Sequence, residues 1–283
     1  MTGYSFSQVD VFASAPLTGN PVAVVHDASG LDDDQMQAFA SWTNLSETTF
    51  LLPPTDSGAD YRLRIFTPAE ELPFAGHPTL GSAHAWLESG GVPATEGSVV
   101  QECGVGLIQL RRDGEDLAFR APEFLREGDV DERTLAQAIT ALGVDRDRVV
   151  RSNWVDNGPG WLGLQLVSAD DVLDLRPDFA AMSGLEIGVI GAHDDARSAE
   201  LGADYEVRAF CPGFSIPEDP VTGSLNAGFA VWLTRAGHLP GDYVTRQGTA
   251  LGRNGRVRIE TDETGEVWVG GTSRTLIEGA LTL

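Results

Sequence analysis

A segment that occurs twice, half a chain apart, most constrains how this sequence folds. Tyr61-Arg-Leu-Arg-Ile-Phe-Thr-Pro68 matches Tyr205-Glu-Val-Arg-Ala-Phe-Cys-Pro212 at an offset of 144 residues, in a chain of 283. Each copy has the pattern of a strand closed by a proline, and each is followed by a glycine-containing turn and a helix rich in small residues. The spacing far exceeds the roughly 20–50 residues of solenoid repeats, so it predicts two similar domains facing one another.

The remaining patterns predict an α+β fold with many short strands. A strand over residues 4–12 is expected to form a hairpin with residues 22–25, and a run of three aspartates opens a helix that stops near Asn44. A strand is expected to resume over residues 46–52, a helix over 135–142 and a strand over 161–167. The last strand, residues 276–283, is long enough to cross back to the first domain. The expected domains are residues 1–121 with 272–283, and residues 122–271.

The two copied helices suggest where chemistry takes place. When Pro78 is aligned with Pro220, His77 pairs with Asp219, and the alignment also matches Gly81 with Gly223 and Ser82 with Ser224. A helix that starts just after a glycine turn presents unpaired backbone N–H groups and the positive end of its dipole. Two such helix starts predict a site for an anion, such as the carboxylate of a small substrate.

Composition excludes several classes of function. All 19 basic residues are arginine, and 42 acidic residues give a net charge of −23. Without lysine, a Schiff base to pyridoxal phosphate and a phosphate-binding loop with its lysine are both impossible. The negative charge argues against nucleic acid as a partner. No apolar run is long enough to span a bilayer and no signal peptide is visible, so a cytoplasmic location without membrane contact is expected.

Two cysteines, Cys103 and Cys211, are too few for a disulfide framework and do not form a metal-binding pair. They are expected to be small buried hydrophobic residues. No glycine-rich dinucleotide fingerprint is present either. The sequence therefore predicts neither a cofactor nor a metal.

Several motifs together resemble the PhzF-type phenazine-biosynthesis isomerase family. The resemblance covers essentially the whole chain, in order, and rests on Gly19-Asn20-Pro21, Ser46-Glu47-Thr48, Phe66-Thr67-Pro68, Glu71-Leu72-Pro73-Phe74-Ala75-Gly76-His77-Pro78-Thr79 and Glu218-Asp219-Pro220-Val221-Thr222-Gly223-Ser224. It implies the diaminopimelate-epimerase fold, with two pseudo-symmetric halves, each a sheet curled around a central helix, and an active site in the cleft between them. It also implies a cofactor-free enzyme that forms a homodimer.

The resemblance also implies roles for individual residues. Glu47 matches the general acid/base of the family, and His77, Asp219 and Ser224 match its polar catalytic partners. The implied substrate-binding positions are Ser46, Gly76, Pro78, Thr222 and Gly223, with the two glycine N–H groups holding a substrate carboxylate. A carboxylate can accept and return a proton when burial raises its pKa, and Trp42, Leu45 and Phe50 are expected to surround Glu47.

Two alternatives remain open at this point. Racemases and epimerases of this fold use two opposed cysteines, but the corresponding positions here hold Ala75 and Thr222, so a two-thiol racemase is not expected. The first hypothesis is an isomerase that shifts a proton within a small unsaturated carboxylic acid such as trans-2,3-dihydro-3-hydroxyanthranilate. The alternatives are an epimerase or racemase that uses Glu47 and Asp219 on an amino-acid-like ligand, and a non-catalytic protein that binds a small acid.

Overall fold

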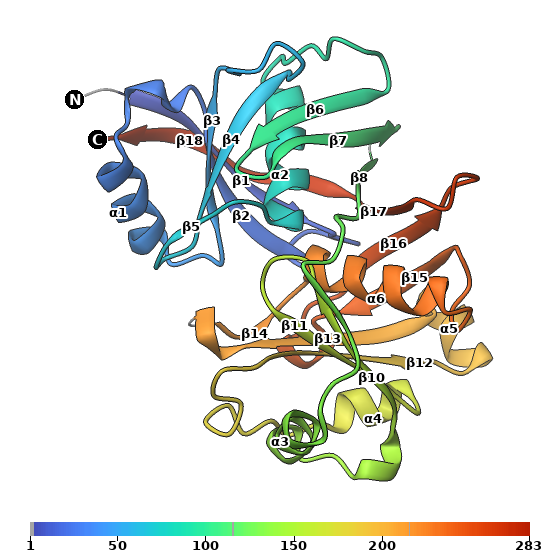
Figure 1. Ribbon diagram of the computed structural model, residues 1–283. Helices are drawn as coiled ribbons and strands as arrows, with labels where there is room; N and C mark the ends of the chain where they lie inside the picture. The colour runs from blue at the N-terminus through green and yellow to red at the C-terminus, as the bar shows by residue number, and fades with distance from the viewer. Residues whose placement is uncertain (1–2, 115, 215) are drawn as a thin grey trace. The chain divides into compact units, whose positions relative to one another are not determined.

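The chain folds into two compact units, each built on one curled sheet (Figure 1). The computed structural model describes residues 3–114, 116–214 and 216–283. The first unit consists of Met1–Arg120 with Gly270–Leu283, and the second of Ala121–Val269. Within the described residues, no helix is long and apolar enough to cross a membrane.

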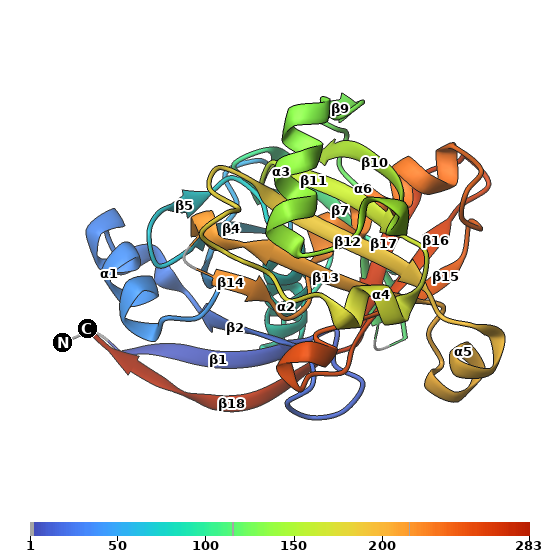
Figure 2. The same ribbon diagram turned by 90° about the horizontal axis from the view of Figure 1, so that it is seen from below.

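The first unit has eight strands in one continuous ladder, with a short ninth strand added beside β4. In ladder order they are β18 (Ser273–Thr282), β1 (Gly3–Val11), β2 (Asn20–Val25), β3 (Thr48–Leu52), β4 (Tyr61–Phe66), β6 (Ser98–Cys103), β7 (Gly106–Asp113) and β8 (Asp116–Arg120), and β5 (Glu71–Leu72) pairs with β4. The pairs β2–β3 and β4–β6 are parallel and the others antiparallel. The C-terminal strand β18 lies beside β1 in both views (Figures 1 and 2), and β1–β2 is the expected hairpin.

The second unit repeats this order of strands. Its ladder runs β9 (Arg126–Gly128), β10 (Val149–Asp156), β11 (Trp161–Leu166), β12 (Glu186–Ala192), β13 (Tyr205–Cys211), β15 (Tyr243–Gln247) and β16 (Gly255–Thr261), and β14 (Ile216–Asp219) pairs with β13. β17 (Val267–Gly271) follows β16 in sequence. The pairs β11–β12 and β13–β15 are parallel, at the positions of the parallel pairs in the first unit. The repeated segment found in the sequence is therefore β4 in one unit and β13 in the other.

Helices provide the crossovers that parallel strands require. In the first unit α1 (Asp33–Thr43) connects β2 to β3, and α2 (Gly76–Glu88) lies between β4 and β6. In the second unit α4 (Ala169–Asp174) connects β11 to β12, and α6 (Gly223–Arg235) lies between β13 and β15. The remaining helices, α3 (Glu132–Leu142) and α5 (Asp195–Leu201), also belong to the second unit. Short 3₁₀ turns cover Ala28–Gly30, Arg146–Arg148, Pro212–Phe214 and Thr249–Leu251.

Each sheet curls around one central helix. α2 contacts β18 and β1 at one end of its ladder and β8 at the other, and α6 contacts both β10 and β16. Small residues allow this close approach: a Cβ atom on Gly81 would lie 2.4 Å from Val22, and one on Gly228 would lie 2.8 Å from the carbonyl oxygen of Val155. Such helices are buried on all sides, which explains why neither has a long polar face.

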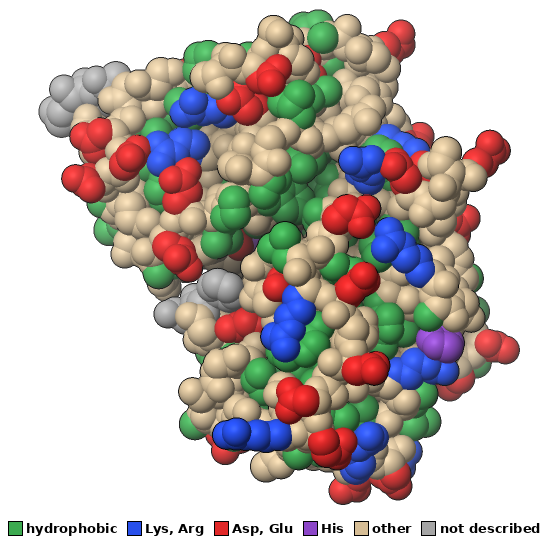
Figure 3. Space-filling model, in the orientation of Figure 1, with side chains coloured by type: hydrophobic (Ala, Val, Ile, Leu, Met, Phe, Trp, Pro, Cys, Tyr) green, Lys and Arg blue, Asp and Glu red, His purple; other side chains and the backbone are tan. Residues whose placement is uncertain are grey.

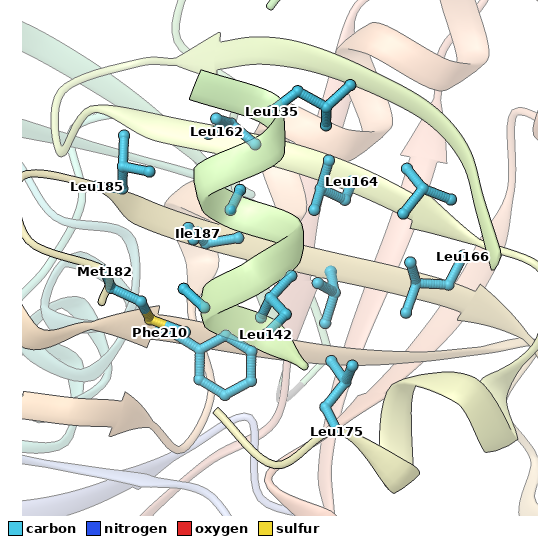
Figure 4. Close-up of a cluster of buried hydrophobic side chains, with 14 of the residues drawn as sticks. Leu135, Leu142, Leu162, Leu164, Leu166, Leu175, Met182, Leu185, Ile187 and Phe210 are labelled. Carbon is cyan, nitrogen blue, oxygen red and sulfur yellow. The ribbon is translucent and has the colours of Figure 1, made fainter. Parts of the chain in front are cut away.

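The outer face of the second sheet carries a separate hydrophobic core (Figure 4). α3 lays Leu135 and Leu142 against side chains of β11, β12 and β13, among them Leu164, Ile187 and Phe210. The apolar residues of α3 recur at helical spacing, and Asp131 caps the helix by accepting a hydrogen bond from Thr134 N–H at 3.0 Å. This layer supports the strands that lead to the end of the sheet where α6 begins.

The two copied strands also make the same side-chain contacts with their neighbours. Asp60 and Asp204 precede β4 and β13, and each carboxylate accepts a backbone N–H of the parallel strand alongside, from Val100 at 2.7 Å and Val244 at 2.8 Å. Four residues further on, Arg64 and Arg208 each bind a carboxylate of the following hairpin strand with two nitrogens. Each guanidinium also lies about 5 Å above the phenylalanine two residues later. The repeat is therefore a repeat of contacts as well as of sequence.

Candidate active site

The first half-site pairs Glu47 with His77. Glu47 lies in the loop between α1 and β3, and His77 is the second residue of α2. The Oε2 atom of Glu47 is 3.3 Å from Nε2 of His77, and the two side chains are 14% and 5% exposed. The structure thus brings together two of the predicted catalytic residues, which are 30 positions apart in sequence.

Burial keeps the His77 ring neutral. It lowers the pKa of His77 to about 3, although a hydrogen bond to the Pro21 carbonyl opposes the shift. Nδ1 of the ring faces the amide nitrogen of Asn20 at 3.4 Å. Because a neutral imidazole carries no charge, the Glu47 carboxyl faces an uncharged polar ring nitrogen at 3.3 Å and not a cation. A pair of this kind can pass or share a proton without forming a tight ion pair.

Asp10 holds the loop that carries Asn20 to His77. Its carboxylate is buried and accepts backbone N–H groups from Thr18 at 3.1 Å and Gly19 at 3.0 Å. A Cβ atom on Gly19 would lie 2.1 Å from the Val11 carbonyl oxygen, so only glycine fits this turn. Reasoning from sequence marked the Gly19-Asn20-Pro21 motif but missed Asp10, whose position inside an ordinary strand gave no signal.

The start of α2 presents backbone donors. Ala75 occupies the N-cap and has no side-chain group that can cap the helix, and the first intrahelical bond runs from Thr79 N–H to the Ala75 carbonyl at 3.2 Å. Gly76 and His77 precede that bond, and Pro78 has no N–H. Gly76, His77 and Pro78 are all buried, while Ser46 in the neighbouring loop is half-buried. These N–H groups are suited to an anion.

The second half-site lies at the start of α6. Asp219 ends β14, Thr222 is the N-cap residue of α6, and Gly223 and Ser224 are its first two residues. The Thr222 hydroxyl donates to Oδ2 of Asp219 at 2.6 Å, so it does not cap its own helix. Asp219, Thr222 and Ser224 are 8%, 6% and 7% exposed. The first turn of α6 therefore has uncapped backbone donors beside a buried carboxylate.

Ser224 is oriented by Trp161, the first residue of β11, and by Asn157 in the turn before that strand. Trp161 Nε1–H donates to its hydroxyl oxygen at 3.0 Å, and the side-chain amide of Asn157 donates to its carbonyl oxygen at 2.8 Å. With the oxygen acting as acceptor for the indole, the hydroxyl proton of Ser224 can be donated elsewhere. Sequence reasoning found the turn containing Asn157 and the strand starting at Trp161 but assigned neither to the site.

The pairing of His77 with Asp219 predicted from the sequence is wrong. The helices begin at Gly76 and Gly223, so the structural counterpart of His77 is Ser224, and Asp219 lies before its helix with no counterpart in the first turn of α2. The alignment failed because β14 is longer than β5, which shifts the following residues. His77 is helical although Pro78 follows it, and Pro78 lies in the first turn, where its missing N–H costs nothing.

Trp42 was expected to surround Glu47 with apolar surface, but its side chain is 80% exposed and stacks on Phe39. The cysteines lie apart from both helix starts. Cys103 ends β6 and is half-buried, and Cys211 is buried at the end of β13. Ala75 and Thr222, the positions matched to racemase thiols from the sequence, are the two helix N-caps.

The arrangement defines the class of protein first. Two units share one strand order, each curled around a buried helix whose start carries polar groups, and this is the α+β fold of the diaminopimelate-epimerase type. A hydroxyproline epimerase from Agrobacterium vitis, 13% identical, matches 99% of this chain and 93% of its own with a TM-score of 0.58, which supports the fold alone.

On the face drawn in Figure 3, arginine side chains are scattered among acidic ones and do not gather in one patch.

The family follows from the sequence comparisons. The model of the phenazine biosynthesis-like proteins, PhzC-PhzF, matches residues 9–279, so the chain belongs to this family. It is 39% identical to antisense-enhancing sequence 1 of Schizosaccharomyces pombe, over 99% of each chain, and 35% identical to the trans-2,3-dihydro-3-hydroxyanthranilate isomerase of Pseudomonas fluorescens, over 88% of this chain and 87% of the relative. A PhzF-family structure from Enterococcus faecalis, 26% identical, superposes over the whole of both chains with a TM-score of 0.80. The chain is an isomerase of the PhzF family.

Proposed function

We propose that this isomerase moves a proton within a small unsaturated carboxylic acid resembling trans-2,3-dihydro-3-hydroxyanthranilate, with Glu47 as general acid/base. The observation that carries the proposal is the 3.3 Å contact between the largely buried Glu47 carboxyl and a His77 ring that burial keeps neutral. The named activity of the Pseudomonas fluorescens relative supports the choice of substrate class.

In the proposed reaction Glu47 takes a proton from a saturated carbon next to a double bond. The electron pair left behind enters the conjugated system, and the protonated Glu47 then delivers a proton to another carbon of that system. The substrate loses and gains one proton, and no oxidant or cofactor is required. His77 donates to or accepts from Glu47 during the two transfers, so the carboxyl group stays oriented in both protonation states.

We propose a role in substrate binding for the residues at each helix start. The backbone N–H groups of Gly76 in the first unit and of Gly223 in the second would bind a substrate carboxylate, with Ser46, Pro78 and Thr222 as further contacts. Asp219 and Ser224 would act on polar substituents of the substrate. Asp219 is an acceptor for an N–H or O–H group, and Ser224 has a proton to donate because Trp161 occupies its oxygen. We further propose that the enzyme is a cytoplasmic homodimer, which sedimentation of the purified protein and cell fractionation would test.

Proton NMR in D₂O with trans-2,3-dihydro-3-hydroxyanthranilate tests the reaction. The wild type is expected to isomerise the substrate, and because Glu47 can exchange its proton with solvent, deuterium should appear at the carbon that receives it. Glu47→Gln should abolish turnover and leave binding of the substrate nearly intact, since the carboxylate contacts lie on other residues. Glu96→Gln, at an exposed turn of the same unit, is the matched control and should behave as wild type.

Each alternative gives a different result in the same experiment. Deuterium incorporation with loss of optical rotation and no new isomer would identify an epimerase or racemase. Binding without any exchange would identify a non-catalytic protein. If Glu47→Gln loses affinity as severely as rate, Glu47 binds the ligand and is not the acid/base.

A further inference from the structure

Behind Asp219 lies a chain of four buried polar side chains, of which sequence motifs marked only the first. In order from the carboxylate they are Thr222, Gln247, Asn226 and Thr245, from 6% to 0% exposed. Thr222 donates to Asp219 at 2.6 Å, and Gln247 Nε2 donates to the Thr222 hydroxyl at 2.8 Å and to the Asp219 carbonyl at 3.1 Å. Asn226 Nδ2 donates to Gln247 Oε1 at 2.9 Å, and the Thr245 hydroxyl donates to Asn226 Oδ1 at 2.6 Å.

We call these four side chains the relay. Backbone groups fix the direction of every hydrogen bond in it. The Thr222 N–H, 3.0 Å from Gln247, can only donate, so the atom it meets must be Oε1. The Asp219 carbonyl can only accept, so the other end of Gln247 must be the NH₂ group. Asn226 is fixed in the same way, because its NH₂ group also faces the Thr222 carbonyl at 2.9 Å. The Thr222 oxygen therefore accepts from Gln247, and its own proton points to Asp219.

The first unit shows that the fold does not require this arrangement. The residue 144 positions before Gln247 is Cys103, also at the end of the strand that runs parallel to the copied strand. The helix N-cap there is Ala75, which has no hydroxyl. The only side-chain amide recorded on that strand near α2, Gln101, binds Thr79 inside the helix at 3.0 Å. The same strands and helix thus form without a relay, which points to a role in the chemistry of the second half-site.

We propose that Gln247 is a positioning residue that, through Thr222, holds Asp219 as a hydrogen-bond acceptor aimed at the substrate. This inference rests on the proposed function. With Oδ2 of Asp219 receiving the Thr222 proton, the carboxylate is kept from rotating and cannot use that oxygen as a donor. Gln247 simultaneously ties the chain on both sides of the turn, at the Asp219 carbonyl and the Thr222 N–H, so the carboxylate and the first turn of α6 keep one relative position.

Gln247→Glu tests the proposal because it changes one nitrogen to oxygen at nearly constant shape. When ionised, Glu at this position can still accept from the Thr222 N–H, but it repels the Asp219 carbonyl and competes for the Thr222 proton. We expect kcat/KM at neutral pH to fall about 10–100-fold, the range for losing a hydrogen bond to a charged group. As the pH falls and the new carboxyl becomes protonated, it can donate again, so the ratio of variant to wild-type activity should rise.

Three controls separate positioning from simple damage. Gln109→Glu adds the same charge at an exposed strand position and should leave activity unchanged. Thr222→Ser keeps the hydroxyl and should retain clearly more activity than Thr222→Val, which should lose activity to the same extent as Gln247→Glu. An activity ratio for Gln247→Glu that does not change with pH, or equal activity of the two Thr222 variants, would overturn the proposal.

A measurement without substrate keeps this test separate from the proposed function. In protein labelled with ¹⁵N-glutamine, the Gln247 side-chain amide should exchange slowly with solvent, because both of its acceptors are buried. Thr222→Val should speed this exchange and Thr222→Ser should not. If the wild type fails to turn over the substrate, the proposed function fails, while this exchange pattern still decides whether the relay holds Asp219. Equal exchange in both variants refutes the relay.

Discussion

Glu186 is expected to make the second unit less stable as the pH rises toward neutrality. It is the first residue of β12, and its register partner on the parallel strand is Trp161, which binds Ser224. Burial raises the pKa of Glu186 from 4.5 to about 7, although a hydrogen bond from the Gly213 backbone opposes the shift. The carboxyl fits so tightly that a Cβ atom on Gly213 would lie 2.2 Å from its Oε1 atom. The folded chain therefore favours the protonated form.

The sign and size of the effect follow from the two pKa values. The folded state binds this proton more tightly than the unfolded state, so the free energy of unfolding is highest below pH 4.5 and declines until about pH 7. A full displacement from 4.5 to 7 corresponds to about 3 kcal/mol, at about 1.4 kcal/mol per pKa unit. Glu186 is only partly buried and solvent screens its charge, so we expect about 1–2 kcal/mol.

Urea unfolding of the wild type and Glu186→Gln at pH 5 and pH 8 measures this contribution. The variant carries no titrating group at this position, so it should gain about 1–2 kcal/mol relative to wild type between the two pH values. Glu263→Gln, at an exposed turn of the same unit, should track the wild type at both. If the difference between the wild type and Glu186→Gln is the same at pH 5 and pH 8, burial does not hold Glu186 protonated, and the reasoning is wrong.

Two further predictions use the same unfolding measurements. Arg208→Met should lower the free energy of unfolding by about 3–5 kcal/mol, because it leaves the Glu218 side chain, 8% exposed, without the arginine that binds it through two nitrogens. Arg197→Met breaks an exposed ion pair in α5 and should lower the free energy of unfolding by less than about 1 kcal/mol. Comparable losses in the two variants would contradict this. Burial lowers the pKa of His77 from 6.5 to about 3, so the free energy of unfolding of the wild type should fall by about 2 kcal/mol between pH 7 and pH 5. His77→Gln should not show this fall. Parallel pH profiles of the two proteins would count against a neutral His77.

Much of the fold could be predicted because its signals are local or repeated. Asp32 caps α1 in a capping box with Gln35, and Asn44 ends it in the left-handed conformation, close to where the sequence placed both ends. The copied strands revealed the two similar units, since both keep buried apolar residues and the same arginine at matched positions. The two short hairpin strands gave no periodicity to detect, because two to four residues hold too few alternations. Their unequal length is what misaligned His77 with Asp219.

The site was predictable only where motifs carried it. Glu47 and His77 were identified through the family resemblance, and their contact depends on a loop and a helix whose approach no spacing encodes. Gln247 is an example of a residue that sequence patterns do not identify. It lies 28 residues beyond Asp219, in a strand that alternates normally, and a glutamine there looks like any other strand residue until the parallel pairing with Val207 places it beneath the turn. Such contacts arise from tertiary packing, which single-sequence patterns do not contain.

The symmetry of the scaffold bears on whether the enzyme moves a proton within its substrate or inverts a stereocentre. Inversion by two matched groups needs equivalent residues on both central helices, but the two N-caps are Ala75, which has no functional group, and Thr222, whose proton is directed to Asp219. The acid/base pair is not repeated in the second unit. Thr48 and Ile187 are the register partners of the copied Phe66 and Phe210, so the counterpart of Glu47 is Glu186, but the counterpart of His77 is Ser224. Asp219 precedes its helix and has no counterpart in the first turn of α2. Because a carboxyl group faces an imidazole at these positions in the first unit and a serine takes the place of the imidazole in the second, the scaffold suits a single base that collects a proton and delivers it to another carbon of its substrate.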